Sequence, residues 1–132
     1  MTSEIHWLGL TVAATALMPF PYVLNRIAVR GLMGTMANPG VNDAPLAAWA
    51  QRAQKAHANA VENLVLFAAA ALAIALTEQG DGLTGTASAV YFAARLLHYG
   101  VYTAGIPVLR TLSFFAGWGA TAVLLGRLLG AW

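Results

Sequence analysis

Four long apolar segments alternate with short polar connections along the chain, and each segment is long enough for a transmembrane helix, which needs about 20 mostly apolar residues. Pro19 and Pro21 should kink the first helix, and Pro45 suits the first turn of the second. No segment shows the period-two alternation of a β-strand. The pattern predicts an all-α integral membrane protein, a four-transmembrane-helix bundle in a single domain spanning 1–132, with helices at about 5–30, 45–78, 86–105 and 107–129.

The composition agrees with a membrane environment. The chain is 59% hydrophobic and only 9% charged, whereas soluble domains carry about 25% charged residues. So much apolar surface cannot be hidden in one small soluble core. The absence of cysteine excludes disulfides, thiolate metal sites and a thiol nucleophile from the protein itself. We expect no metal site, and the formal charge of +2 is too small to suggest nucleic acid.

The charges are distributed unevenly between the two ends of the predicted helices. Basic residues flank the first connection and follow the third, at Arg26, Arg30, Arg52, Lys55 and Arg110. Acidic residues gather at the opposite ends, at Glu4, Glu78 and Asp81. The positive-inside rule then places loops one and three in the cytoplasm and turns both termini outward. The first segment lacks a basic leader and is interpreted as a retained span.

Two predicted helices carry polar stripes into the hydrocarbon. On the second, about 80° of arc contains Arg52, Lys55, Asn59 and Glu62. On the third, about 60° contains Tyr91, Arg95, His98 and Tyr102. The first helix adds Arg26 and Arg30 at the same end. Intramembrane polar residues of this kind mark functional sites by default.

Arg95 lies deep in the predicted bilayer and needs a counter-charge, and Glu62 is the intramembrane carboxylate that can supply it. We therefore expect these two side chains to lie close together, within one subunit or across two. A site so rich in cations suits a small anionic ligand that carries an amine, since arginines bind carboxylates in bidentate fashion and Glu62 can take the amine. A nearby guanidinium would also lower the pKa of a bound thiol from about 8.5.

Each of these residues also has a purely structural interpretation. Glu62 and Arg95 can form an ion pair whose only role is to hold the bundle together, and His98 can form a hydrogen bond with a neighbouring helix that has no further role. His57 lies off the main stripe and is expected to touch headgroups or a loop. Arg26 can act only in setting the orientation of the protein in the membrane, and the tyrosines can be interfacial or packing aromatics.

Four motifs occur in order along the chain. They are Met36-Ala-Asn-Pro39, Lys55-Ala-His-Ala-Asn59-Ala-Val-Glu62, Ala94-Arg95-Leu-Leu-His98 with Tyr102, and Pro107-Val-Leu-Arg110. With these motifs the chain resembles the MAPEG family, the membrane-associated proteins of eicosanoid and glutathione metabolism, and its small bacterial members above all. The resemblance covers nearly the whole chain.

The resemblance implies a homotrimer in the bacterial inner membrane that binds glutathione, as cosubstrate, between neighbouring subunits near the cytoplasm. It also implies glutathione transfer or peroxide reduction on lipophilic small molecules that arrive from the membrane lipid. Lys55 stands where many relatives have Arg, and Asn63 where one eicosanoid branch has Tyr, so general glutathione chemistry is expected. The matching positions give Arg110 the role of activating the thiol, and glutathione contacts to Arg30, Lys55, Asn59, Glu62, Arg95, His98 and Tyr102.

Two rival functions use the same architecture. The first is a non-enzymatic membrane protein that binds lipids or thiols, and the placement of Arg110 separates it from an enzyme. The second is a small transporter or channel subunit, which would need a continuous polar path across the bilayer. Residues 68–76 are nearly all Ala and Leu, which argues against such a path.

Overall fold

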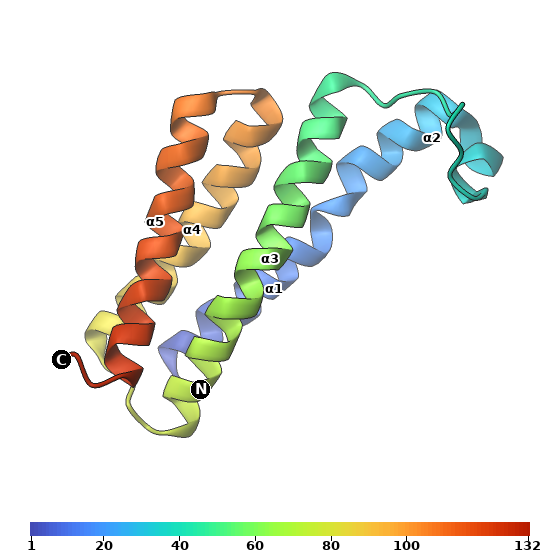
Figure 1. Cartoon of the computed structure of the whole chain (residues 1–132). Helices are drawn as coiled ribbons and strands as arrows, with labels where there is room; N and C mark the ends of the chain where they lie inside the picture. The colour runs from blue at the N-terminus through green and yellow to red at the C-terminus, as the bar shows by residue number, and fades with distance from the viewer.

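The computed structural model describes all 132 residues and contains helices but no strands, as the sequence predicts. Four antiparallel spans form the molecule, and the first of them is divided by a kink (Figure 1). The helices are α1 (Ser3–Leu17), α2 (Pro19–Met36), α3 (Ala48–Leu76), α4 (Gly82–Ala104) and α5 (Pro107–Leu128).

The kink of the first span lies where the sequence predicts it. Helix α1 ends at Leu17 and α2 begins at Pro19, because a proline ring removes one backbone donor and clashes with the preceding turn. The Met18 carbonyl at the kink accepts a hydrogen bond of 2.9 Å from the Tyr99 hydroxyl of α4. Beyond the kink, α2 leans away from α4 and α5 and stays beside α3 (Figure 1).

The structure corrects the predicted end of the first span. The prediction stopped at Arg30, but helical structure continues to Met36 across Gly31, whose φ of 70° and ψ of 168° break the regular helix. A positive φ is available to glycine without steric cost. Gly31 therefore redirects the chain instead of ending the helix, and the residues after it resume helical geometry.

Two predicted helix starts are also wrong. The second predicted helix began at Pro45, whereas α3 begins at Ala48, because the extended Ala47 donates its N–H to the Asn25 side chain of α2 at 3.0 Å. The third was predicted from residue 86 but α4 begins at Gly82, where the Asp81 side chain caps the first turn. The fourth predicted helix, 107–129, agrees with α5 to within one residue.

Three spans are long and apolar enough to cross a membrane: the kinked Ser3–Met36, Ala48–Leu76 and Pro107–Leu128. Helix α4 has 23 residues, about 34 Å at 1.5 Å per residue, so it is also long enough to span the hydrocarbon. Its lower apolar content has a structural cause, because its polar side chains lie inside the bundle: Thr84, Ser88, Arg95 and His98 are buried.

Helix α4 is the centre of the packing, in contact with α1, α3 and α5. The face of α3 that points into the bundle is lined with alanines, which let helix backbones approach closely. Between α3 and α4, the buried rings of Phe67 and Tyr91 stack with centroids 3.8 Å apart and planes 6° from parallel. This stack closes the middle of the bundle between its two polar ends.

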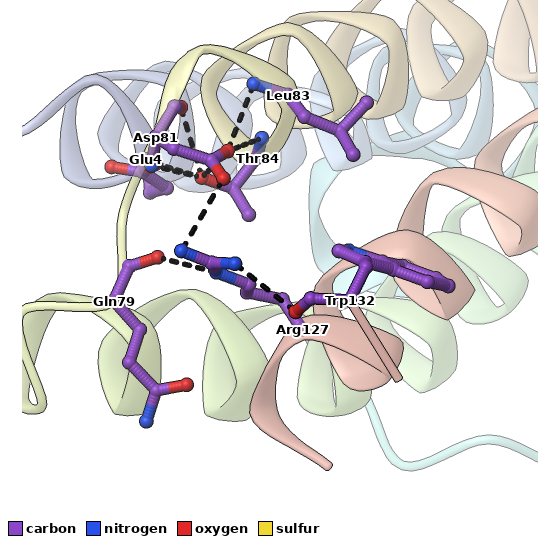
Figure 2. A network of polar contacts seen from close by, with 7 residues as sticks. All are labelled: Glu4, Gln79, Asp81, Leu83, Thr84, Arg127 and Trp132. Carbon is purple, nitrogen blue, oxygen red and sulfur yellow. Dashed lines mark hydrogen bonds and ion pairs between the residues drawn. The ribbon is translucent and has the colours of Figure 1, made fainter. Parts of the chain in front are cut away.

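One polar end contains both termini and the turn from α3 to α4 (Figure 1). There Asp81 accepts hydrogen bonds of 2.9 Å from the N–H groups of Leu83 and Thr84, and these bonds hold the pKa of its carboxyl below the ordinary value. The Thr84 hydroxyl donates to the buried Glu4 carboxylate at 2.6 Å. Figure 2 shows how Arg127 of α5 joins this network, with an ion pair of 3.5 Å to Asp81.

Candidate functional site

The predicted site residues gather at the other end of the bundle, where a cavity of about 250 Å³ opens between α3, α4 and α5. Four of the eight predicted residues line it, one from α3, two from α4 and one from α5. Two further residues of α5, one turn apart on the same side of the helix, complete the wall. The lining consists of Asn59, His98, Tyr102, Arg110, Thr111 and Phe114.

Arg95 lies beside this cavity with only 2% of its surface exposed. One terminal nitrogen donates to the Asn59 amide oxygen at 2.5 Å and lies 3.3 Å from Nδ1 of His98. A guanidinium has only donors, so Nδ1 accepts and the proton of a neutral His98 ring lies on Nε2. Arg95 therefore fixes the orientation of both the amide and the imidazole at the cavity.

Gly117 of α5 leaves the space that Arg95 occupies. A Cβ atom at this position would lie 3.3 Å from Cδ of Arg95, so a larger residue would push the arginine against its partners. Nε and Nη1 of Arg95 have no hydrogen-bond partner within the chain. Since a buried cation is costly unless it is paired, these two groups retain the capacity to bind a negative charge.

Arg110 is held without being neutralised. Its Cζ atom lies 4.8 Å from the centroid of the Tyr102 ring, which is a cation–π contact. The only ion pairs in the chain join Arg30 to Asp43 and Arg127 to Asp81. The Arg110 guanidinium therefore faces the cavity beside Tyr102 with its charge free for an anionic ligand.

The expected contact between Glu62 and Arg95 is wrong within one chain. Glu62 is exposed and forms no ion pair, because it lies about 200° around α3 from the buried Ala60. Its side chain thus points out of the bundle while Arg95 points into it. The contact across two subunits stays a prediction.

Lys55 and Arg30 also lie outside the cavity of their own chain. Lys55 is exposed and, seven residues before Glu62, shares its outward face of α3. Arg30 lies in α2, directly before the break at Gly31, and its side chain reaches the connection to α3: its Nε donates to the Ala44 carbonyl at 2.8 Å, and it pairs with Asp43 at 3.4 Å. One chain thus brings five predicted residues together and leaves three at its surface.

Some side chains have contacts or positions that were not predicted. His57 was expected to touch headgroups or a loop, and the structure places its Nδ1 2.7 Å from the Tyr22 hydroxyl, in a half-buried contact between α2 and α3. Thr111 and Phe114 were not predicted to line the site. Phe114 follows Arg110 by four residues, so helical spacing alone would have placed it on the same face.

A larger cavity, of about 370 Å³, lies at the opposite end of the bundle, beside the network of Figure 2. Its lining contains three carboxylates, those of Glu4, Glu78 and Asp81, and no cationic side chain. These carboxylates repel an anion, whereas the smaller cavity offers Arg110 and an imidazole. The smaller cavity is therefore the candidate site for an anionic ligand.

Comparison with known proteins gives one result. The model of the MAPEG family matches residues 5–130, which include α2 to α5 in full, α1 from Ile5 onward and all eight predicted site residues. Comparison with curated proteins and with solved structures finds no match.

Proposed function

Because the chain belongs to the MAPEG family, we propose that it is a membrane-bound glutathione transferase that acts on lipophilic electrophiles. The observation that carries the proposal is the cavity between α3, α4 and α5. It combines a free guanidinium at Arg110, an amide at Asn59 and an imidazole at His98. These groups complement the carboxylates, peptide groups and thiol of a small anionic tripeptide.

In the proposed reaction, Arg110 stabilises the thiolate of glutathione electrostatically. The thiolate sulfur attacks the electrophilic carbon of the lipophilic substrate, a carbon–sulfur bond forms, and the leaving group departs with the bonding electrons. The thiol proton is released to solvent. No protein nucleophile is required, which agrees with the absence of cysteine. Positioning and charge stabilisation then supply most of the rate enhancement.

The outward face of α3 supports a site shared between subunits. Lys55 and Glu62 are exposed there, on the same helix as Asn59 but outside the cavity of their own chain. In a homotrimer, this face of one subunit would contribute Lys55 to a carboxylate of glutathione and Glu62 to its amine. Arg30 would reach the ligand from α2.

The rival function, binding without turnover, is disfavoured by the placement of Arg110. A binding protein needs no free cation beside the thiol, yet Arg110 lines the cavity and has no carboxylate partner. Reduction of lipophilic peroxides would use the same thiolate, with attack on oxygen in place of carbon and a second glutathione to complete the disulfide.

The proposal is tested with the purified protein in detergent. We expect glutathione, but not other low-molecular-weight thiols, to raise the thermal midpoint. We also expect conjugation of glutathione to an aryl halide, followed by the absorbance of the product. A protein that is neither stabilised by glutathione nor active with an aryl halide or a lipid hydroperoxide would refute the proposal.

A further inference from the structure

Arg52 holds the corner between α4 and α5 without lining the cavity. Its Nε donates a hydrogen bond of 2.9 Å to the carbonyl of Thr103, in the last turn of α4. Its guanidinium lies against Gly105, where a Cβ atom would lie 3.2 Å from Nε and 3.3 Å from Cζ. A larger residue at position 105 would therefore crowd the guanidinium and require it to shift.

The end of α4 explains why a cation is needed there. Gly105, with φ 82° and ψ 32°, donates its N–H to the Tyr102 carbonyl, and Ile106 donates to Val101 at 2.9 Å. This C-terminal motif leaves the Thr103 carbonyl without a backbone donor. Arg52 supplies the missing donor and places a positive charge at the negative end of the helix dipole.

The same corner sets the position of the proposed thiolate-stabilising group. Tyr102 immediately precedes Thr103, and Arg110 lies in the first turn of α5, where its N–H donates to the Ile106 carbonyl at 3.1 Å. The Arg110 guanidinium rests on the Tyr102 ring at 4.8 Å. A shift of the corner would therefore move Arg110 relative to the cavity.

We propose that Arg52 is a positioning residue for glutathione activation, which acts through the corner at Thr103 and Gly105 to hold Arg110 at the thiol. The inference rests on the proposed transferase function. It assigns to Arg52 a role distinct from ligand contact, since its Nε is already bonded to the Thr103 carbonyl at the corner. Its loss should impair activation of the thiol more than binding of the tripeptide.

Two variants disturb this contact in different ways, and a third provides a matched control. Arg52→Gln removes the cation, and Gly105→Ala keeps it but places a Cβ 3.2 Å from Nε of Arg52, at a φ of 82° that alanine rarely adopts. The control is Arg127→Gln. Arg127 makes the same kind of contact at the opposite end, where its Nε donates to the Gln79 carbonyl of the turn between α3 and α4 at 3.1 Å (Figure 2).

We expect Arg52→Gln and Gly105→Ala to lower kcat for the aryl halide by about tenfold to a hundredfold, as displacement of a catalytic group does. The KM for glutathione should stay close to that of the wild type. An ultraviolet titration of bound glutathione should show thiolate formation at higher pH in both variants but not in Arg127→Gln. Normalising to bound glutathione restricts this readout to folded protein.

Wild-type kcat and an unchanged thiolate titration in Arg52→Gln would overturn the inference while leaving the transferase proposal intact. Equal losses in all three variants would also overturn it, because they would indicate general destabilisation. A wild-type protein without glutathione binding or turnover would instead refute the proposed function itself.

Discussion

Arg95 and Arg110 lie near the same cavity but differ in what surrounds them. Arg95 is buried and bonded to Asn59 and His98, so its position is determined by neighbouring side chains. Arg110 is half-buried and rests on the Tyr102 ring, with no carboxylate partner. The first arginine therefore organises the cavity wall, and the second is available to a ligand.

Replacing Arg110 by Ala should reduce kcat for the aryl halide by about a hundredfold, the loss seen when one preorganised stabilising group is removed. Glutathione should still bind, because the other polar groups of the cavity remain. Steady-state kinetics and calorimetry in detergent measure the two effects separately. Equal turnover in Arg110→Ala and wild type would remove this residue from the mechanism.

Glu62→Gln should weaken glutathione binding by about tenfold to a hundredfold, since a hydrogen bond to a charged group contributes about 1.5–3 kcal/mol. Calorimetric titration measures the change in Kd. Glu78→Gln is the matched control, because Glu78 is an exposed carboxylate that lines the cavity at the opposite end of the bundle. The same affinity in Glu62→Gln and wild type would contradict contact between this carboxylate and the ligand amine.

The start of α4 depends on a capping box, which begins the helix at Gly82 instead of at the predicted residue 86. Asp81 accepts hydrogen bonds from two backbone N–H groups, and the Thr84 hydroxyl accepts a hydrogen bond of 2.8 Å from the Asp81 N–H. These bonds satisfy donors at the helix end that have no intrahelical partner. The cap overrides the low helix propensity of Gly82 and Gly85.

The capping box predicts a pH dependence of stability. The pKa of Asp81 is lower in the folded protein than its ordinary value, mainly because the Thr84 N–H bonds the ionised carboxylate. The contribution is therefore present above the ordinary value of about 4 and is lost as the pH falls through the folded-state pKa. Thermal melts between neutral and acidic pH should converge for wild type and Asp81→Asn as the pH falls, with wild type more stable at neutral pH. Melting curves that stay parallel would contradict this role.

The outward face of α3 indicates how copies of the chain assemble. Lys55 and Glu62 are exposed on the same face of an apolar span. A charged side chain at the centre of a bilayer costs about 2.5–3.5 kcal/mol on insertion scales. Packing of this face against a neighbouring subunit would remove both charges from lipid. It would also bring them to the candidate site of that neighbouring subunit.

We therefore expect native mass spectrometry of the detergent-solubilised protein to show a trimer. Lys55→Glu should shift the distribution toward monomer, because it places a second negative charge on the face that already carries Glu62. Arg127→Gln, at the other end of the bundle, should leave the trimer unchanged. A monomeric wild-type protein would leave the proposed shared site without its second wall.

The sequence was sufficient to predict the class of fold, because hydropathy and helix length depend on local composition. The kink at Pro19 and the α5 helix agree with the prediction for the same reason, since proline acts on its own turn. The helix starts at Ala48 and Gly82 could not be predicted in this way. They depend on the hydrogen bond from the Ala47 N–H to the Asn25 side chain and on the cap at Asp81. These hydrogen bonds form only when the folded backbone brings donor and acceptor together.

Spacing predicted the shared face of Arg95, His98 and Tyr102 on α4, and five of the eight predicted residues lie at or beside one cavity. The stripe predicted on α3 divides, because Asn59 lines the cavity while Lys55 and Glu62 are exposed. The bundle was needed to show that Glu62 points outward while Arg95 points inward, because the rotation of a helix about its axis is set by packing against its neighbours. The corner held by Arg52 required the fold for a similar reason. Arg52 and Thr103 lie 51 residues apart in the chain, and no local sequence pattern connects them.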